Sequence, residues 1–190
     1  MSSLRSPTAS SPVHYRIEPA DLHAHLFSVT LTIAAPAARQ EVSLPVWIPG
    51  SYLVREFSKN LQGLQAQQDG TPVPLAQLDK HRWQAQCRKG QPLVLTYQVA
   101  AYDNSVRTAW LDAARGFFNG TSLCLRVHGR EDGAHLLEIV RTPATNGWSV
   151  ATCLTAEKTN RAGFGTYRAD SYDELVDCPV EMGTFWSVRF

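Results

Sequence analysis

The sequence predicts an all-β fold, either a mainly antiparallel β-sandwich or one large curved sheet. Apolar and polar residues alternate in five segments, which are 27–33, 42–46, 83–87, 93–99 and 123–127. Alternation is typical of strands with one buried face, because successive side chains on a strand point to opposite sides. Turn signals recur about every 10 to 20 residues, and long helical patterns are missing. Strands that follow one another without intervening helices favour antiparallel pairing.

Glycine-containing dipeptides mark the expected turns. Asp69-Gly70 and Asn119-Gly120 accept the positive φ angles of a two-residue hairpin turn, so both predict hairpins. One short helix is expected at 171–177, because Ser171 and Glu174 have the spacing of a capping box.

The length of 190 residues predicts one domain with a small extension. We expect a disordered lead-in at 1–12, a β domain at 13–183, and the start of a link or strand at 184–190. The last segment alternates Trp186, Val188 and Phe190 with polar residues up to the end of the chain.

Charge and composition exclude several classes of partner. The net charge is +1, from 18 basic and 17 acidic residues, and no run of five like charges occurs. We therefore expect no nucleic-acid partner and no membrane partner. The amino-terminal residues lack the apolar segment of a secretory signal, which predicts a cytoplasmic protein. The four cysteines are far apart and form no C-x-x-C motif, so four free thiols are favoured over two disulfides.

Motifs that carry chemistry are missing from the sequence. It contains no H-E-x-x-H, no G-x-S-x-G and no glycine-rich phosphate loop. His23 and His25 would share a strand face, but no nearby cysteine or carboxylate cluster completes a ligand set. The sequence thus predicts no catalytic residue, no metal ligand and no cofactor in this chain.

Two segments are harder to explain as scaffold. Residues 44–57 run from a strand into two prolines and several aromatic residues, which predicts a rigid loop outside the sheet. Residues 177–183 contain Pro179, which ends the short helix and presents Glu181 from an extended stretch.

Four segments together resemble a known family. They are Pro45-Val-Trp-Ile-Pro-Gly-Ser-Tyr52 with Arg55-Glu-Phe57, Tyr102-Asp-Asn-Ser-Val-Arg107, Gly116-Phe-Phe-Asn-Gly-Thr-Ser122, and Tyr172-Asp-Glu-Leu-Val-Asp-Cys-Pro-Val-Glu-Met-Gly183. In this order they are similar to the N-terminal domain of the glycyl aminopeptidase family (peptidase family M sixty-one), zinc peptidases that usually also carry a PDZ domain. The resemblance covers about residues 13 to 190.

The resemblance implies a parent protein with an N-terminal β domain, a zinc-binding catalytic domain with H-E-x-x-H, and a PDZ domain. This chain then stops before the catalytic part. Its implied role is that of a non-catalytic β domain that packs on its own catalytic domain and walls the cleft for a peptide substrate. The alternative is a stand-alone β-sandwich module that binds carbohydrate or a protein ligand. Exposed aromatic residues on one sheet face would favour that alternative, whereas Trp83 is expected on a buried face.

Glu181 is the candidate anchor for the substrate's amino group. An α-amino group titrates near ~7.7–8.0, so it is largely protonated at neutral pH and can bind a carboxylate. The competing interpretation is that Glu181 pairs with a nearby arginine or caps a backbone amide. The weaker candidates for the cleft or the interdomain boundary are Trp47, Tyr52, Arg55, Glu56 and Arg107. We also expect Trp47, Tyr52 and Trp186 to be exposed in this chain, because the implied catalytic domain would cover them in the parent protein.

Overall fold

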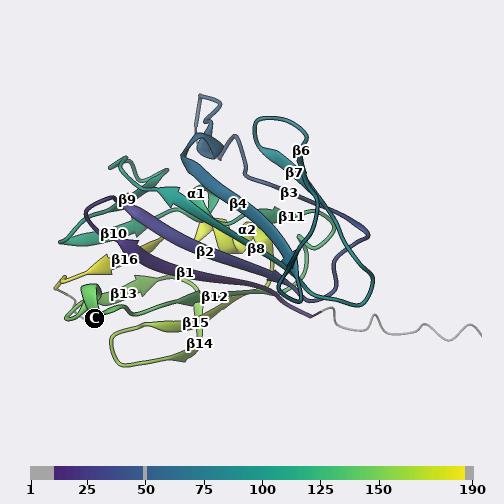
Figure 1. Ribbon diagram of the computed structural model, residues 1–190. Helices are drawn as coiled ribbons and strands as arrows, with labels where there is room; N and C mark the ends of the chain where they lie inside the picture. Colours follow the sequence, from purple (N-terminus) through teal and green to yellow (C-terminus); the bar gives the residue numbers. More distant parts are fainter. Residues whose placement is uncertain (1–10, 49–50, 187–190) are drawn as a thin grey trace, which may run out of the picture.

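The strands form two layers in the computed structural model, which describes residues 11–48 and 51–186 (Figure 1). The first layer is one eight-stranded sheet. Its spatial order is β14 (Thr155–Thr159), β15 (Gly165–Ala169), β12 (His135–Ile139), β1 (Val13–Asp21), β2 (Leu26–Ile33), β8 (Leu93–Ala100), β4 (Leu61–Gln68) and β5 (Thr71–Pro72). Its strand pairs are antiparallel except for β1 and β12, which run parallel.

The second layer consists of two four-stranded sheets. One has the order β13 (Ser149–Thr152), β16 (Val180–Gly183), β10 (Arg115–Phe118) and β9 (Ala109–Leu111). The other has the order β11 (Arg126–Val127), β3 (Arg39–Ser43), β7 (Arg82–Gln86) and β6 (Leu75–Gln77). Two short helices, α1 (Gly120–Leu123) and α2 (Tyr172–Asp177), lie between these sheets in Figure 1. The 3-10 turns are η1 (Phe57–Asn60) and η2 (Pro143–Thr145). The predicted all-β class with mainly antiparallel pairing is confirmed.

The predicted alternation produces the core. Phe27, Val29, Leu31 and Ile33 on β2 are each at most 1% exposed, while the residues between them are half-buried. The same pattern continues on β1 and β8, the two neighbours of β2. Trp83 on β7 is also buried, as expected. The inward faces of the sheets therefore meet in one continuous hydrophobic core.

Of the predicted turns and helix caps, two are confirmed and one is wrong. Asp69 and Gly70 have φ angles of 49° and 72° and form the turn between β4 and β5. The hydroxyl oxygen of Ser171 accepts a hydrogen bond from the backbone amide of Glu174 at 3.1 Å, and Ser171 thereby caps α2. The predicted hairpin at Asn119-Gly120 is wrong: the Asn119 side chain accepts the amide of Thr121 at 3.1 Å, so it caps α1 instead.

The predicted strand at 123–127 shrinks to the two residues of β11, because the preceding carbonyls bind side chains instead of a neighbouring strand. The buried hydroxyls of Tyr15, Tyr97 and Tyr172 donate to the carbonyls of Leu125, Leu123 and Cys124 at 2.7, 2.6 and 2.8 Å. Burial raises the pKa of all three hydroxyls well above the ordinary value of tyrosine, so they stay protonated as donors. We call these three tyrosines and the segment 123–125 the tyrosine clamp.

The prediction of four free thiols is wrong for one pair. Cys153 and Cys178 are joined by a disulfide, with their Cα atoms 5.4 Å apart. Cys87 and Cys124 are free. Sequence spacing could not show the pair, because the fold brings the end of β13 beside the chain that enters β16. The expected lead-in and the end of the expected link, residues 1–10 and 187–190, lie outside the described residues.

His135 is a buried titratable group beside the tyrosine clamp. Its ring lies between Tyr15 and Tyr172, with centroids 6.0 and 5.9 Å away. Its Nδ1 bonds the carbonyl of Gly133 at 2.7 Å, while the buried Nε2 has no partner among the described residues. Burial lowers the pKa of His135, and the positive charge of Arg130 adds to this effect. The imidazole is thus held neutral in the folded protein.

We predict that stability falls as the pH drops below about 6.5, the pKa of histidine in an unfolded chain. The lowered pKa of folded His135 means that the unfolded chain binds a proton there which the folded chain does not. The stabilisation is therefore complete above that pH and is lost toward acid. Urea unfolding at pH 7.5 and 5.5 should show a smaller loss for His135→Gln than for the unmodified chain. An equal loss in both would show that other groups cause the acid sensitivity.

Candidate functional site

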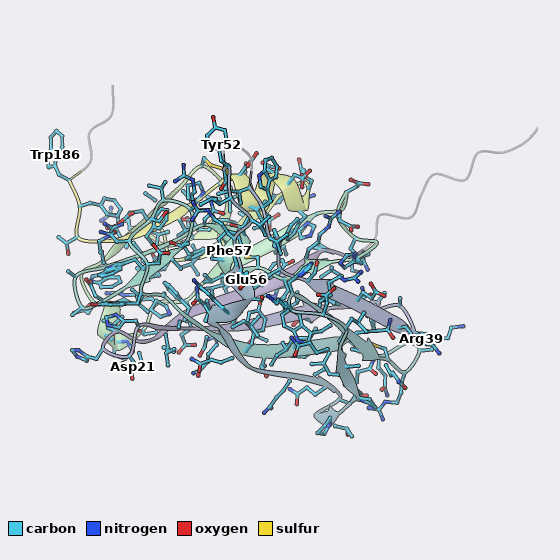
Figure 2. All side chains as sticks on the ribbon, turned by 90° about the horizontal axis from the view of Figure 1, so that it is seen from above. Asp21, Arg39, Tyr52, Glu56, Phe57 and Trp186 are labelled. Atoms are coloured by element: carbon cyan, nitrogen blue, oxygen red, sulfur yellow. A yellow bond between two sulfur atoms is a disulfide. The ribbon has the colours of Figure 1, made fainter. Side chains whose placement is uncertain are left out.

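The segments that carry the family resemblance come together on the side of the second layer. Figure 2 shows Tyr52 and Trp186 projecting from this side, away from the eight-stranded sheet. Trp47, Tyr52 and Trp186 are 53%, 104% and 85% exposed, as expected from the sequence. Further exposed apolar side chains come from the first two segments, namely Leu53, Val54, Tyr102 and Val106. We call the exposed apolar residues Trp47, Tyr52, Leu53, Val54, Tyr102, Val106 and Trp186 the apolar rim.

The loop before η1 is held by its own hydrogen bonds. The indole Nε1 of Trp47 donates to the carbonyl of Ser51 at 2.7 Å. The amide of Arg55 donates to the carbonyl of Val46 at 2.6 Å, and its Nε donates to the Ser51 hydroxyl at 3.3 Å. Buried Ile48 anchors the loop in the core. Trp47 and Arg55, two predicted site residues, are thus brought together through Ser51.

Two pockets open where the segments meet. One has a volume of about 340 Å³ and lies between residues 53–60 and the pair Asp103 and Thr108. The other has a volume of about 400 Å³ and is walled by Trp47, by Asn119 and by the outer side of α2. The first segment of the family resemblance therefore contributes to both pockets, and each of the other three contributes to one.

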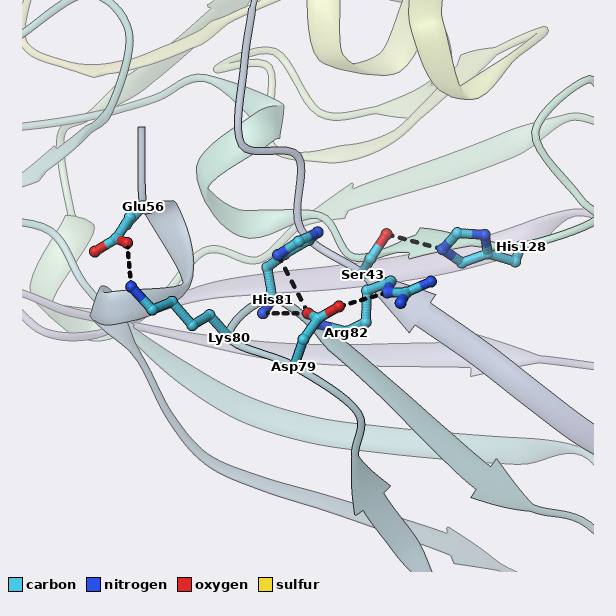
Figure 3. A network of polar contacts seen from close by, with 7 residues as sticks. All are labelled: Ser43, Glu56, Asp79, Lys80, His81, Arg82 and His128. Carbon is cyan, nitrogen blue, oxygen red and sulfur yellow. Dashed lines mark hydrogen bonds and ion pairs between the residues drawn. The ribbon is translucent and has the colours of Figure 1, made fainter. Parts of the chain in front are cut away.

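Glu56 and Arg107 do not lie together with Glu181 in one site. Glu56 forms an ion pair with Lys80 at 2.8 Å, and this hydrogen bond lowers the pKa of Glu56 (Figure 3). Arg107 belongs to the loop between β8 and β9, where its amide donates to the hydroxyl of Ser105 at 3.3 Å. Neither residue contacts Glu181 in the hydrogen bonds and ion pairs of the described chain.

Figure 3 also shows a serine, a histidine and an aspartate near one another, which could suggest a nucleophilic triad. The hydroxyl of Ser43 lies 2.9 Å from Nε2 of His128. Asp79, however, contacts His81 and Arg82 rather than His128. A triad needs its carboxylate on the second nitrogen of the same imidazole that faces the serine. The arrangement therefore supports no acyl-transfer site.

Glu181 lies on β16 and faces outward beside an arginine that the sequence analysis did not single out. Nε of Arg115 lies 3.2 Å from one carboxylate oxygen of Glu181, and Nη2 donates to the other at 3.3 Å. The two side chains are 41% and 39% exposed. Partial burial raises the pKa of Glu181, whereas the Arg115 guanidinium opposes that rise. Of the two interpretations left open, the structure shows the pairing with arginine, at a carboxylate that solvent still reaches.

A row of aromatic side chains leads toward Glu181 on the outer face of the β13-β16-β10-β9 sheet. Trp110 pairs across the strands with Phe117, which in turn pairs with Glu181. Tyr102 stacks on Trp110 with centroids 4.9 Å apart, and the ring of His25 lies 4.3 Å from Tyr102. The rings of His25, Tyr102 and Trp110 stack in part on one another, while Tyr102 stays 67% exposed.

No group of three or more histidine, cysteine, aspartate or glutamate side chains in residues 11–48 and 51–186 could hold a metal ion. None of the helices described for this chain is both long enough and apolar enough to cross a membrane.

Comparison with known proteins identifies the family. The family model of the Peptidase M61 N-terminal domain matches residues 14–184, and the chain belongs to this family. No curated protein matches the chain. The chain is similar to the crystal structure of an aminopeptidase N family protein from Idiomarina loihiensis, with 46% sequence identity and a TM-score of 0.87. That match covers 90% of this chain and 29% of the other.

More distant solved structures share the fold alone. A zinc metallopeptidase of family M1 from Deinococcus radiodurans, bound to a Tyr-Ser-Ala substrate, has 13% identity and a TM-score of 0.51. This match covers 92% of the present chain and 42% of that chain. Aminopeptidase A from Legionella pneumophila, in complex with aspartic acid, has 10% identity and a TM-score of 0.50, over 92% and 21% of the two chains.

We predict that Arg115→Met raises the pKa of Glu181 further above its ordinary value. The guanidinium opposes the effect of burial, so its removal leaves burial unbalanced. Carbon NMR of the glutamate carboxyl groups during a pH titration measures this directly. Arg168→Met is the matched control, because Arg168 pairs with Glu157 and Asp170 instead. A pKa of Glu181 that stays unchanged in Arg115→Met would contradict the assignment of the pair.

Proposed function

We propose that this chain is the non-catalytic N-terminal domain of a zinc-dependent aminopeptidase similar to the glycyl aminopeptidases. In this proposal it packs on the catalytic domain of its parent and forms one wall of the cleft for a peptide substrate. The observation that carries the proposal is the apolar rim, which lies in and beside the segments of the family resemblance and exposes Trp47, Tyr52 and Trp186. Aromatic residues of this kind are enriched in the centres of protein interfaces.

The chain's own residues serve binding and shape in this proposal. Zinc belongs to the catalytic part of the parent, since the described residues offer no ligand set for it. The parent also carries the PDZ domain and resides in the cytoplasm. The apolar rim and the two pockets beside it are the parts of the chain that face the catalytic domain.

Glu181 is the proposed anchor for the α-ammonium of the substrate. Its carboxylate is half-exposed and already partly withdrawn from water, so an ammonium would gain a charge-assisted hydrogen bond there. Arg115 fixes the position of the carboxylate, and Phe117 on the neighbouring strand supplies an apolar wall. Trp47, Tyr52, Arg55, Glu56 and Arg107 belong to the boundary of the same cleft in this proposal.

We predict that the catalytic domain protects the apolar rim. Amide hydrogen exchange of 51–57 and 103–108 should be about tenfold slower or more in the full-length parent than in the 190-residue chain, because packing restrains loops that open easily. The exposed strand β14, at the edge of the eight-stranded sheet, is the internal control and should exchange equally in both. Equal exchange of the rim in both proteins would refute the docking surface.

We predict that Glu181→Gln in the full-length parent costs about 1.5–3 kcal/mol in kcat/KM for substrates with a free amino group. The neutral amide keeps the shape of the side chain but removes the charge that holds an ammonium. Substrates with a blocked amino group should be almost unaffected. Glu157→Gln is the matched control, since Glu157 also pairs with an arginine but lies on β14. A similar loss on free and blocked substrates, or no loss on either, would eliminate the anchor role.

A further inference from the structure

We propose that Cys153 and Cys178 form a redox modification site, at which a low-molecular-weight thiol reversibly opens the disulfide and so releases β13 from β16. Cys153 directly follows Thr152, the last residue of β13, and Cys178 lies two residues before Val180, the first residue of β16. Thr152 and Val180 are partners in the ladder between these strands. The disulfide therefore fastens one end of this ladder.

The side chains of β13 itself are at most partly buried, whereas Trp148 before it and Leu154 after it are buried in the core. β13 is the edge strand of its sheet and contains four residues. Outside the ladder, the amide of Val150 donates to the carbonyl of Ala162 at 2.7 Å. The chain then passes through Cys153 and Leu154 into β14, an edge strand of the other layer whose five residues are all exposed. The covalent bond thus ties down a segment in which few buried contacts oppose opening.

The disulfide is also accessible to a reagent. Cys153 is exposed and Cys178 is half-buried, so an attacking thiolate can reach the sulfur of Cys153 from solvent. Cys124, by contrast, is completely buried, and Cys87 is half-buried. Accessible disulfides are the ones that exchange with small thiols, whereas buried cysteines stay inert. The buried Cys124 therefore serves as an internal control.

Glutathione can open the disulfide by two successive thiol–disulfide exchange steps. One glutathione thiolate attacks Sγ of Cys153, forms a mixed disulfide and releases the thiolate of Cys178. A second glutathione thiolate attacks the glutathione sulfur of that mixed disulfide and releases the thiolate of Cys153. Two glutathione molecules become one glutathione disulfide, and the protein gains two electrons and two protons. The reverse sequence closes the bond again.

Opening the bond affects the strand that carries Glu181. Ala151 on β13 is the ladder partner of Glu181, so a loosened β13 leaves the backbone of Glu181 paired with β10 alone. Any consequence for catalysis rests on the proposed function. The local change itself does not, because it can be measured on the 190-residue chain.

The chain is equilibrated with reduced glutathione or with glutathione disulfide, and thiol exchange is stopped with acid. The chain is then denatured and alkylated, and mass spectrometry counts the alkylated cysteines. We expect four alkylated cysteines in the reduced sample and two in the oxidised sample. Amide exchange of Ser149–Thr152 should be about tenfold faster in the reduced chain, while that of Phe27–Val29 in the central ladder stays unchanged. In amide exchange, the double variant Cys153→Ser with Cys178→Ser should match the reduced chain in both buffers, and Cys87→Ser should match the unmodified chain.

Three results would overturn the proposal. Four alkylated cysteines in glutathione disulfide would show that the bond does not form in solution. Two alkylated cysteines in excess reduced glutathione would show that small thiols cannot open it. Equal exchange of β13 in the two redox states would show that the bond does not fasten the strand. The unmodified chain alone decides all three, even if the double variant does not fold.

Discussion

The tyrosine clamp is the interaction on which the arrangement of the two layers depends. The segment 123–125 leads from α1 to β11, so it joins the two small sheets of the second layer. Its three carbonyls are buried and would each lack a partner if the tyrosines were absent, which is costly in a dry interior. Tyr15 and Tyr97 reach them from the eight-stranded sheet, and Tyr172 reaches them from α2. The clamp therefore fixes both small sheets against the large one, and with them the apolar rim.

Local patterns predicted the fold wherever burial alone decides the structure. The alternation on β2 requires only that one face of the strand is buried and the other faces solvent. The turn at Asp69-Gly70 requires only that these two residues adopt positive φ angles. The failures occurred where a distant group decides. Asn119 can begin a hairpin or cap a helix, and in the structure its side chain caps α1, directly before the segment that the clamp holds. The disulfide between Cys153 and Cys178 likewise depends on a strand pairing that spacing does not encode.

The candidate site was predictable in part for the same reason. Two prolines deny the 44–57 loop a place in a sheet, and the catalytic domain implied by the resemblance added the expectation that Trp47 and Tyr52 are exposed. Glu181 could be placed outside a helix because Pro179 precedes it. Its partner Arg115 could not be predicted, because it lies 66 residues earlier in the chain, on β10. Only the pairing of β10 with β16 brings the two side chains together. The strand parity that Arg115 shares with Phe117 is a signal that could have indicated its outward position, but the sequence analysis did not use it.

The parallel pairing of β1 with β12 has a consequence for biosynthesis. A ribosome completes β1 and β2 long before His135–Ile139 exist, so the edge of β1 that pairs with β12 has no partner until those residues are made. The hydroxyl of Tyr15 likewise waits for a carbonyl 110 residues later in the sequence. Contacts of such long sequence separation make folding slow, because a large loop must close before any of them forms. The nascent chain therefore carries an open strand edge, with unpaired backbone groups, until β12 is synthesised and covers it.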